Sequence, residues 1–138
     1  MADRCVFCAI ANGEISAHVV LDDEFVIAFL DHRPVFKGHV LLAPKRHVET
    51  LPDLPRDLVE PYFLRAQSLA AGVQEALSAD GSFVAINNTV SQSVPHLHVH
   101  IVPRRRKDGL RGFFWPRTKY ANDDEMAEYA EKIRAAVG

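Results

Sequence analysis

The stretch PHLHVHIVPRRR, residues 95–106, constrains the fold of this chain more than any other. It places His96, His98 and His100 at every second position, and apolar residues fill the positions between them. Successive side chains of a strand point to opposite faces, so the pattern predicts a strand with one apolar face and one histidine face. A single histidine in a strand is more often a structural residue, but three neighbouring imidazoles must share hydrogen bonds, metals or anions. The row therefore favours a functional site in a polar cleft.

Hydrophobic periodicity and turn residues divide the rest of the chain into short strands and helices. The clearest helix spans about residues 56–79, where apolar residues recur at three- and four-residue steps until Asp80-Gly81. Strands that are followed by a helix and then by more strands indicate an α+β domain with an antiparallel sheet. The other expected elements are a short helix or turn over 5–15, a hairpin over 18–31 that turns at Asp22-Asp23, strands over 39–43, 82–88 and 96–102, and a C-terminal helix over 123–137.

Length and charge limit the class of protein. The chain has 138 residues, of which 48% are hydrophobic, and a net charge of -2. This length fits a single domain over 1–138 whose core needs no disulfide, and the near-neutral charge argues against general nucleic-acid binding. No apolar run approaches the roughly 20 residues of a membrane span, and the N-terminal MADRCVFC lacks the layout of a signal peptide. We therefore expect a cytoplasmic protein with reduced thiols and no membrane partner.

A row of histidines suits nucleophilic chemistry beside a bound phosphate. Imidazole can act as a nucleophile at neutral pH, a neighbouring group can fix its tautomer, and a further donor can neutralise charge on a bound phosphate. Gln92 and Ser93 add small polar donors just before the row, and Pro95 rigidifies its entry.

Several motifs, in order along most of the chain, closely resemble the histidine triad (HIT) superfamily of nucleotide hydrolases and transferases. They are QSVPHLHVHIVPR, CVFCAI, AFLDHRPVFKGHVLLAPKRHVETL and the C-terminal helix. The resemblance implies a HIT fold: a five-stranded antiparallel sheet with one long helix, a short N-terminal helix and a C-terminal helix. It also implies a homodimer in which the two sheets become one, and a nucleotide substrate with adenine or another purine base.

The resemblance implies a two-step mechanism as well. His98, the middle histidine of the triad, attacks the α-phosphorus, a covalent nucleotidyl-histidine forms, and water releases the nucleoside monophosphate. A neutral ring is suited to a phosphorus crowded by anionic oxygens, and flanking donors stabilise the transition state. The other positions carried over are His100 and Ser93 at the phosphate oxygens, His39 at a family histidine, Asp31 at the ribose hydroxyls, Gln92 as a further polar donor at the nucleotide, and Phe7, Ile10 and Phe29 around the base.

Cys5 and Cys8 form a C-x2-C pair, the spacing of a zinc knuckle or of a redox pair. No thioredoxin-like βαβ pattern surrounds the pair, which weakens the redox interpretation; two small buried thiols are a further alternative. A subset of bacterial HIT proteins resembles this arrangement, and that resemblance implies a structural Zn2+ held by Cys5, Cys8, His47 and His96. Four protein ligands leave no position for an activated water.

Several alternatives remain open at the level of sequence. The substrate is a nucleoside phosphoramidate or a dinucleoside polyphosphate, while a non-catalytic, zinc-containing nucleotide-binding or interaction module is the alternative from another class. The basic run 104–107 fits a solvated turn or a contact with distal phosphates. The aromatic segment 109–120 fits a dimer contact, a substrate lid, or packing of the tail onto the body.

Overall fold

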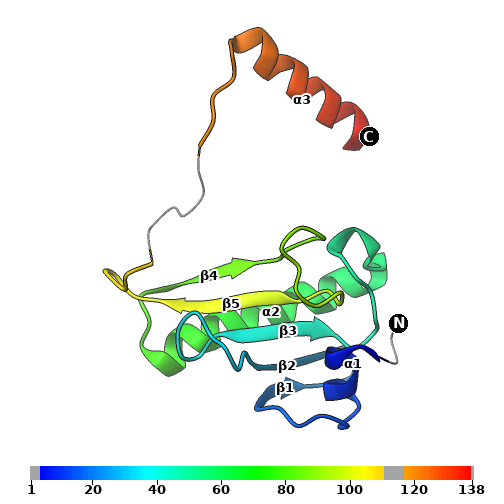
Figure 1. Ribbon diagram of the computed structural model, residues 1–138, viewed down its shortest axis with the longest axis vertical. Helices are drawn as coiled ribbons and strands as arrows, with labels where there is room; N and C mark the ends of the chain where they lie inside the picture. The colour runs from blue at the N-terminus through cyan, green and yellow to red at the C-terminus, as the bar shows by residue number, and fades with distance from the viewer. Residues whose placement is uncertain (1–3, 111–116, 138) are drawn as a thin grey trace. The chain divides into compact units, whose positions relative to one another are not determined.

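The computed structural model describes residues 4–110 and 117–137 and shows an α+β architecture (Figure 1). The aromatic residues Phe113, Phe114 and Trp115 lie outside the described residues. The elements in chain order are α1 (Val6–Ala11), β1 (Val19–Asp22), β2 (Val26–Leu30), β3 (Val40–Pro44), the 3-10 turn η2 (Leu51–Asp53), α2 (Arg56–Leu77), β4 (Gly81–Ala85), β5 (Val99–Arg104) and α3 (Asp123–Val137).

The five strands form one antiparallel sheet in the order β1-β2-β3-β5-β4, as expected. β3 and β5 lie side by side although 54 residues lie between Pro44 and Val99 in the sequence. Leu41 pairs with His100 across this junction, and Ala85 pairs with His100 from the other side. The histidine segment therefore leads into an interior strand, between β3 and the edge strand β4.

One face of the sheet is covered by α2, which runs behind the strands in Figure 1. The buried residues between them alternate along the strands, as the period of two requires. Tyr62 of α2 is 1% exposed, and its hydroxyl donates a hydrogen bond of 2.8 Å to the Leu42 carbonyl. This buried core consists of Val26, Ala28, Val40, Leu42, Leu54, Tyr62, Ala66, Val73, Leu97, Val99 and Ile101.

The opposite face of the sheet carries a second apolar cluster, against which α1 packs. Its buried members are Cys5 and Phe7 from the N-terminal segment, with Ile27 and Phe29 of β2 and Leu41 and Ala43 of β3. His98 and His100 lie on this face, because the alternate residues Leu97, Val99 and Ile101 face α2. The site thus forms on the side of the sheet that α2 leaves open.

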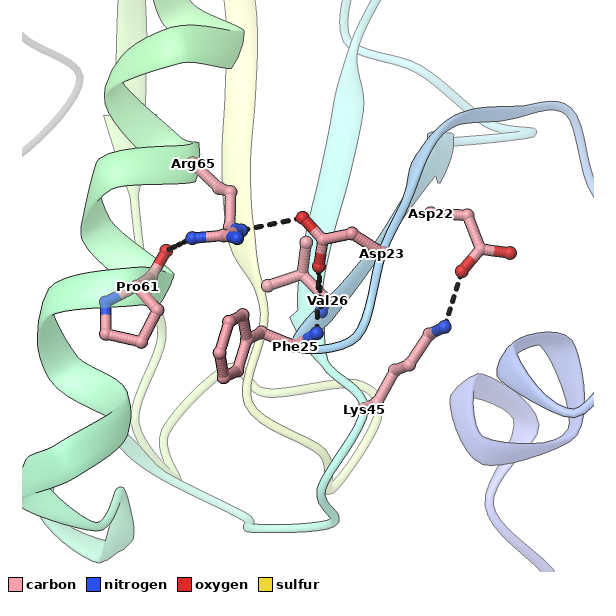
Figure 2. A network of polar contacts seen from close by, with 7 residues as sticks. All are labelled: Asp22, Asp23, Phe25, Val26, Lys45, Pro61 and Arg65. Atoms are coloured by element: carbon pink, nitrogen blue, oxygen red, sulfur yellow. Dashed lines mark hydrogen bonds and ion pairs between the residues drawn. The ribbon is translucent and has the colours of Figure 1, made fainter.

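The β1–β2 hairpin turns at Asp23, in agreement with the sequence prediction. Asp23 Oδ1 accepts hydrogen bonds from the backbone N–H groups of Phe25 and Val26, at 2.8 and 3.0 Å. Its other oxygen accepts from Arg65 Nε at 2.7 Å, which ties the turn to α2 (Figure 2). One side chain therefore closes the turn and fixes its position against the helix.

Some boundaries differ from the expected ones for physical reasons. β5 begins at Val99 rather than at residue 96, because the Leu97 N–H donates to the Val48 carbonyl of the loop after β3. α2 ends at Leu77, two residues early, since Ser78 adopts a left-handed conformation with φ 51° that stops the helix. Phe63, one of the apolar residues whose spacing predicted this helix, is 39% exposed instead of buried.

Contacts divide the chain into two compact units, 1–108 and 109–138. The second unit contains α3. Asn122 precedes this helix and caps it, because Asn122 Oδ1 accepts a hydrogen bond from the Glu125 N–H at 2.9 Å. The apolar face of α3 is exposed at Met126, Tyr129 and Ile133. Within the part of the chain that the structure describes, no helix has the length and apolar character to cross a membrane.

Candidate active site beside a candidate metal centre

Two groups of side chains converge on the open face of the sheet, and the histidine row belongs to both. The His96 ring faces the N-terminal segment, while the His98 and His100 rings lie next to one another with centroids 4.9 Å apart. His96 and His98 precede β5 but keep its alternation, since Leu97 between them is fully buried against α2. The predicted division of the row into an apolar and a histidine face is confirmed.

The first group contains Cys5, Cys8, His47 and His96, the four residues that the sequence analysis assigned to a metal. Their ligand atoms all lie within 4.8 Å of one another, so the group could hold a metal ion. His96 Nδ1 lies 3.2 Å from Cys5 Sγ, 3.5 Å from Cys8 Sγ and 3.2 Å from His47 Nδ1. Cys8 Sγ lies 3.4 Å from His47 Nδ1. Both cysteines are free thiols.

A hydrogen bond at Nε2 of the His96 ring fixes its tautomer so that Nδ1 could bind a metal. His96 Nε2 lies 2.7 Å from the Pro44 carbonyl, which can only accept, so Nε2 carries the ring proton. Nδ1 is left with its lone pair toward the cysteines, and metal-bound histidines usually make this kind of second contact. Burial lowers the pKa of His96, which keeps the ring neutral and able to coordinate.

His98 is held in the opposite tautomer. Its Nδ1 lies 2.7 Å from the backbone carbonyl of His96, so Nδ1 carries the proton and Nε2 keeps the lone pair. The edge of Phe7 packs against the ring at a centroid distance of 5.0 Å. Burial lowers the pKa of His98, although the His96 carbonyl and the Asp31 charge oppose this effect. The ring is therefore neutral at pH 7, with the nitrogen that could attack unprotonated.

The second group joins His100, His39 and Asp31 behind the His98 ring. His39 Nε2 lies 3.0 Å from His100 Nδ1, and His39 Nδ1 lies 3.8 Å from Asp31 Oδ2. Burial lowers the pKa of His39 and, together with repulsion from His98 and His39, lowers that of His100 to about 4. The family resemblance implied that His39 belongs to the same site as the triad, and the antiparallel pairing of β3 with β5 brings it next to His100.

The predicted base-contacting residues also meet at this site. The rings of Phe7 and Phe29 are 5.3 Å apart in an edge-to-face arrangement, and Ile10 packs partly buried against the same cluster.

Ser93 lines a pocket of about 250 Å³ together with Cys5 and His47.

Gln92 lies in the loop before the histidine row. Its Oε1 accepts from the Thr89 N–H of the same loop at 2.9 Å, and its Nε2 donates to the Glu49 carbonyl of the loop after β3 at 2.6 Å. The described contacts of Gln92 therefore organise the loop that leads into the row.

The basic run after β5 is partly occupied by contacts within the protein. Arg104 Nε donates to Asp108 Oδ2 at 2.7 Å, and the Arg105 guanidinium donates to the Leu77 carbonyl at the end of α2. These contacts favour the interpretation of 104–107 as a structural turn.

Backbone groups were the part of the site that the sequence could not reveal. The carbonyls of Pro44 and His96 orient two histidine rings, and the N–H of Val35 donates to His39 Nδ1 at 3.1 Å. Every residue carries the same backbone donor and acceptor, so no residue type marks them in a sequence.

Comparison with known proteins identifies the family. Residues 12–107 match the family model of the HIT domain. The chain belongs to the HIT family. It is 35% identical to "Protein hit" of Bacillus subtilis over 138 residues, which covers 99% of this chain and 93% of the relative. The adenosine 5'-monophosphoramidase HNT1 of Saccharomyces cerevisiae is 34% identical over 77% of this chain and 66% of its own length.

Solved HIT structures agree with this fold. A HIT family protein from Bacillus anthracis superposes with a TM-score of 0.88 at 30% identity and full coverage of both chains. A Zn-bound histidine triad family protein from Mycobacterium smegmatis superposes with a TM-score of 0.75 at 35% identity, covering 98% of this chain and 99% of that one. The expected HIT fold, with its five-stranded antiparallel sheet and three helices, is confirmed.

Proposed function

We propose that this HIT protein is a nucleotidyl hydrolase or transferase that acts at the α-phosphate of nucleoside phosphoramidates or dinucleoside polyphosphates. The observation that carries the proposal is the His98 ring, which is buried and neutral and which the His96 carbonyl holds with Nε2 unprotonated. The similarity to a relative named as an adenosine 5'-monophosphoramidase supports an adenine nucleotide with a phosphorus–nitrogen bond as the first substrate to test.

The reaction proceeds in two displacements at phosphorus. His98 Nε2 forms a bond to the α-phosphorus while the bond from phosphorus to the leaving nitrogen or oxygen breaks, which gives a nucleotidyl-His98. Water then attacks the same phosphorus, the bond to His98 breaks, and a nucleoside monophosphate is released. The leaving group takes up one proton, so the net reaction consumes one water. A neutral nucleophile suits this centre because it adds no repulsion with the phosphate oxygens.

The neighbouring residues hold the substrate. His100 and Ser93 donate hydrogen bonds to phosphate oxygens, and Asp31, which is partly exposed, accepts from the ribose hydroxyls. The base lies against the apolar cluster of Phe7, Phe29 and Ile10. Gln92 acts at the nucleotide through the loop that it organises.

A structural zinc ion fits the cluster of two cysteines and two histidines. With Zn–S bonds of about 2.3 Å and Zn–N bonds of about 2.0–2.1 Å, a tetrahedron separates two nitrogens by about 3.3 Å and a sulfur from a nitrogen by about 3.5 Å. The observed separations of 3.2 Å between nitrogens and 3.2 to 3.5 Å between sulfur and nitrogen match these edges. Bound zinc would cross-link the N-terminal segment, the loop after β3 and the histidine row, with no open position for water.

The catalytic proposal is tested by release of AMP from adenosine 5'-phosphoramidate and from a diadenosine polyphosphate. We expect turnover by the wild type, and loss by more than about 1,000-fold in His98→Ala and His98→Gly. His18→Ala is the matched control, because His18 is exposed. Binding of AMP without any turnover, and without an acid-labile nucleotidyl adduct in the mass spectrum, would refute catalysis and favour the alternative of a non-catalytic binding module.

The zinc proposal is tested by metal analysis. We expect about one zinc per chain in the wild type and in His18→Ala, and less in Cys8→Ser. Replacing zinc by cobalt should produce the visible absorption of tetrahedral cobalt with sulfur ligands, which reports the donor set without reference to activity. Equal zinc in Cys8→Ser and wild type would overturn the assignment.

Homodimerisation through the sheet is also part of the proposal. β1 and β4 are the two edges of the sheet, and a continuous sheet across a dimer has to pair one of them with its copy. Light scattering coupled to size exclusion should give twice the mass of 15.4 kDa, whereas the monomer mass at micromolar concentration would contradict it.

A further inference from the structure

The His39 ring is buried at 3% exposure, and both of its nitrogens are already engaged within the protein. Nδ1 lies 3.1 Å from the backbone nitrogen of Val35, and Nε2 lies 3.0 Å from His100 Nδ1. A ring in this situation has no nitrogen left for a substrate. Any influence of His39 on the reaction has to pass through His100.

The Val35 contact decides where the protons lie. A backbone N–H can only donate, so His39 Nδ1 has to be the acceptor and the ring proton has to sit on Nε2. His39 Nε2 then donates to His100 Nδ1, which places the proton of His100 on its own Nε2. Burial lowers the pKa values of both rings, in agreement with neutral forms.

Asp31 is the competing partner for His39. If Nδ1 carried the proton and donated to Asp31, the order of donors along the chain of rings would reverse. Asp31 Oδ2 is 3.8 Å from Nδ1, which exceeds the length of a hydrogen bond, whereas the Val35 nitrogen is at 3.1 Å. The other Asp31 oxygen accepts from the Arg33 N–H at 2.9 Å. The geometry therefore favours the amide.

We propose that the backbone N–H of Val35, acting through His39, is the positioning group that fixes His100 as an Nε2–H donor beside the nucleophilic His98. The inference rests on the proposed function, since it concerns the second ring of the same site. His98 and His100 then carry opposite tautomers: His98 presents a lone pair at Nε2 and His100 presents an N–H. One ring can attack phosphorus while its neighbour donates to a phosphate oxygen.

The opposite tautomer of His100 would harm the reaction in two ways. A lone pair at Nε2 would face phosphate oxygens instead of a donor, and the transition state would lose one hydrogen bond to its developing charge. Losing one such donor costs roughly 100- to 1,000-fold in rate in other enzymes. Because kcat is proportional to the fraction of His100 in the donor tautomer, an equal mixture should lower kcat by about 2-fold and a shift of nine-tenths of the population by about 10-fold.

The direct test is nitrogen NMR of the full-length protein labelled with 15N-histidine at pH 7.5. Protonated and unprotonated ring nitrogens differ strongly in chemical shift, so each tautomer can be read without any assay of activity. We expect a proton on Nε2 of His39 and of His100, and on Nδ1 of His98. A proton on Nδ1 of His39 or of His100 in the wild type would overturn the proposal, whatever the variants do.

Three variants identify the group that sets the tautomer. Val35→Pro removes the N–H, and we expect His100 to become a mixture of tautomers with a lower kcat and a nearly unchanged KM. Val35→Ala keeps the N–H and should keep the wild-type tautomers, since the Val35 side chain is 53% exposed. Asp31→Asn should also keep them. A switch of His100 in Asp31→Asn, or unchanged tautomers in a folded Val35→Pro, would refute the role of the amide.

The outcomes separate this proposal from the proposed function. If the wild type releases no AMP but shows the expected tautomers, the catalytic function fails and the positioning by Val35 stands. If AMP is released while His100 is protonated on Nδ1, the function stands and the positioning fails. Should Val35→Pro be unfolded by circular dichroism, the wild-type spectrum and Asp31→Asn still decide the question.

Discussion

Acidification should destabilise this protein through His100, and the size of the effect follows from the burial of the ring. The pKa of His100 in the folded protein is about 4, lowered by burial and by repulsion from His98 and His39. An unfolded histidine has a pKa of about 6.5. Between these two values the unfolded chain binds more protons than the folded one, so the free energy of unfolding falls as the pH falls from about 6.5 toward 4.

The magnitude can be worked out from the linkage relation. Each pH unit inside this window changes the free energy of unfolding by about 1.4 kcal/mol per ring, and pH 5 lies about 1.5 units below the unfolded pKa. Protonation of His100 in the unfolded state therefore lowers the stability by about 2 kcal/mol between pH 7 and pH 5. With a urea m-value of about 2 kcal/mol per molar, the midpoint should shift by about 1 M.

Urea unfolding of the wild type and of His100→Asn at pH 5, 6, 7 and 8 isolates this contribution. Asparagine places an amide oxygen near the position of Nδ1, so it can still accept from His39, but it does not titrate. The pKa values of His39 and His98 are lowered chiefly by burial, which the substitution preserves. The two proteins should have the same zinc content at each pH, so that any loss of metal at low pH cancels in the difference between their stabilities. Parallel pH profiles of the two proteins, within about 0.5 kcal/mol, would refute the reasoning.

Four further substitutions test the scaffold by chemical denaturation, each read as a loss in the free energy of unfolding. Gly38→Ala should cost about 1–3 kcal/mol, because φ at Gly38 is +99° and a Cβ there would overlap Leu77 Cδ1; no measurable loss would contradict it. Tyr62→Phe should cost about 1–2 kcal/mol, since it removes the buried hydroxyl that donates to β3, and a neutral result would show that the carbonyl finds another donor. Asp23→Ala should lower the free energy of unfolding more than Arg65→Ala, because Asp23 also accepts hydrogen bonds from two backbone N–H groups. The partly exposed ion pair itself contributes less than about 1 kcal/mol, and the reverse order of the two losses would contradict this.

The period-two pattern of residues 96–101 was enough to predict both faces of the row. Leu97, Val99 and Ile101 are fully buried against α2, and the histidines lie on the other face. The pattern did not predict that the strand begins only at Val99. Side-chain alternation reports an extended backbone, but a strand also needs a neighbour, and before residue 99 the neighbour is the loop that contains Val48.

The clusters of the site depend on contacts that a sequence does not encode locally. His39 and His100 are 61 residues apart and meet because β3 and β5 are adjacent, which only the sheet order determines. The four metal-binding candidates were assigned by resemblance, and the C-x2-C spacing alone left a redox pair open. The distances between Cys5, His47 and His96 now favour a metal cluster.

His96 links the two centres through different parts of the same residue. Its ring faces the cysteines with Nδ1, while its backbone carbonyl accepts a hydrogen bond of 2.7 Å from His98 Nδ1. A rotation of the His96 peptide would therefore disturb the tautomer of His98, the proposed nucleophile, and the Pro44 carbonyl opposes such a rotation by holding the His96 ring. His96 and His98 are two residues apart, so both rings lie on the same face of the extended chain. A shift of one residue would place His98 in the core against α2 and turn Leu97 toward the proposed phosphate site, so the row tolerates no change of register.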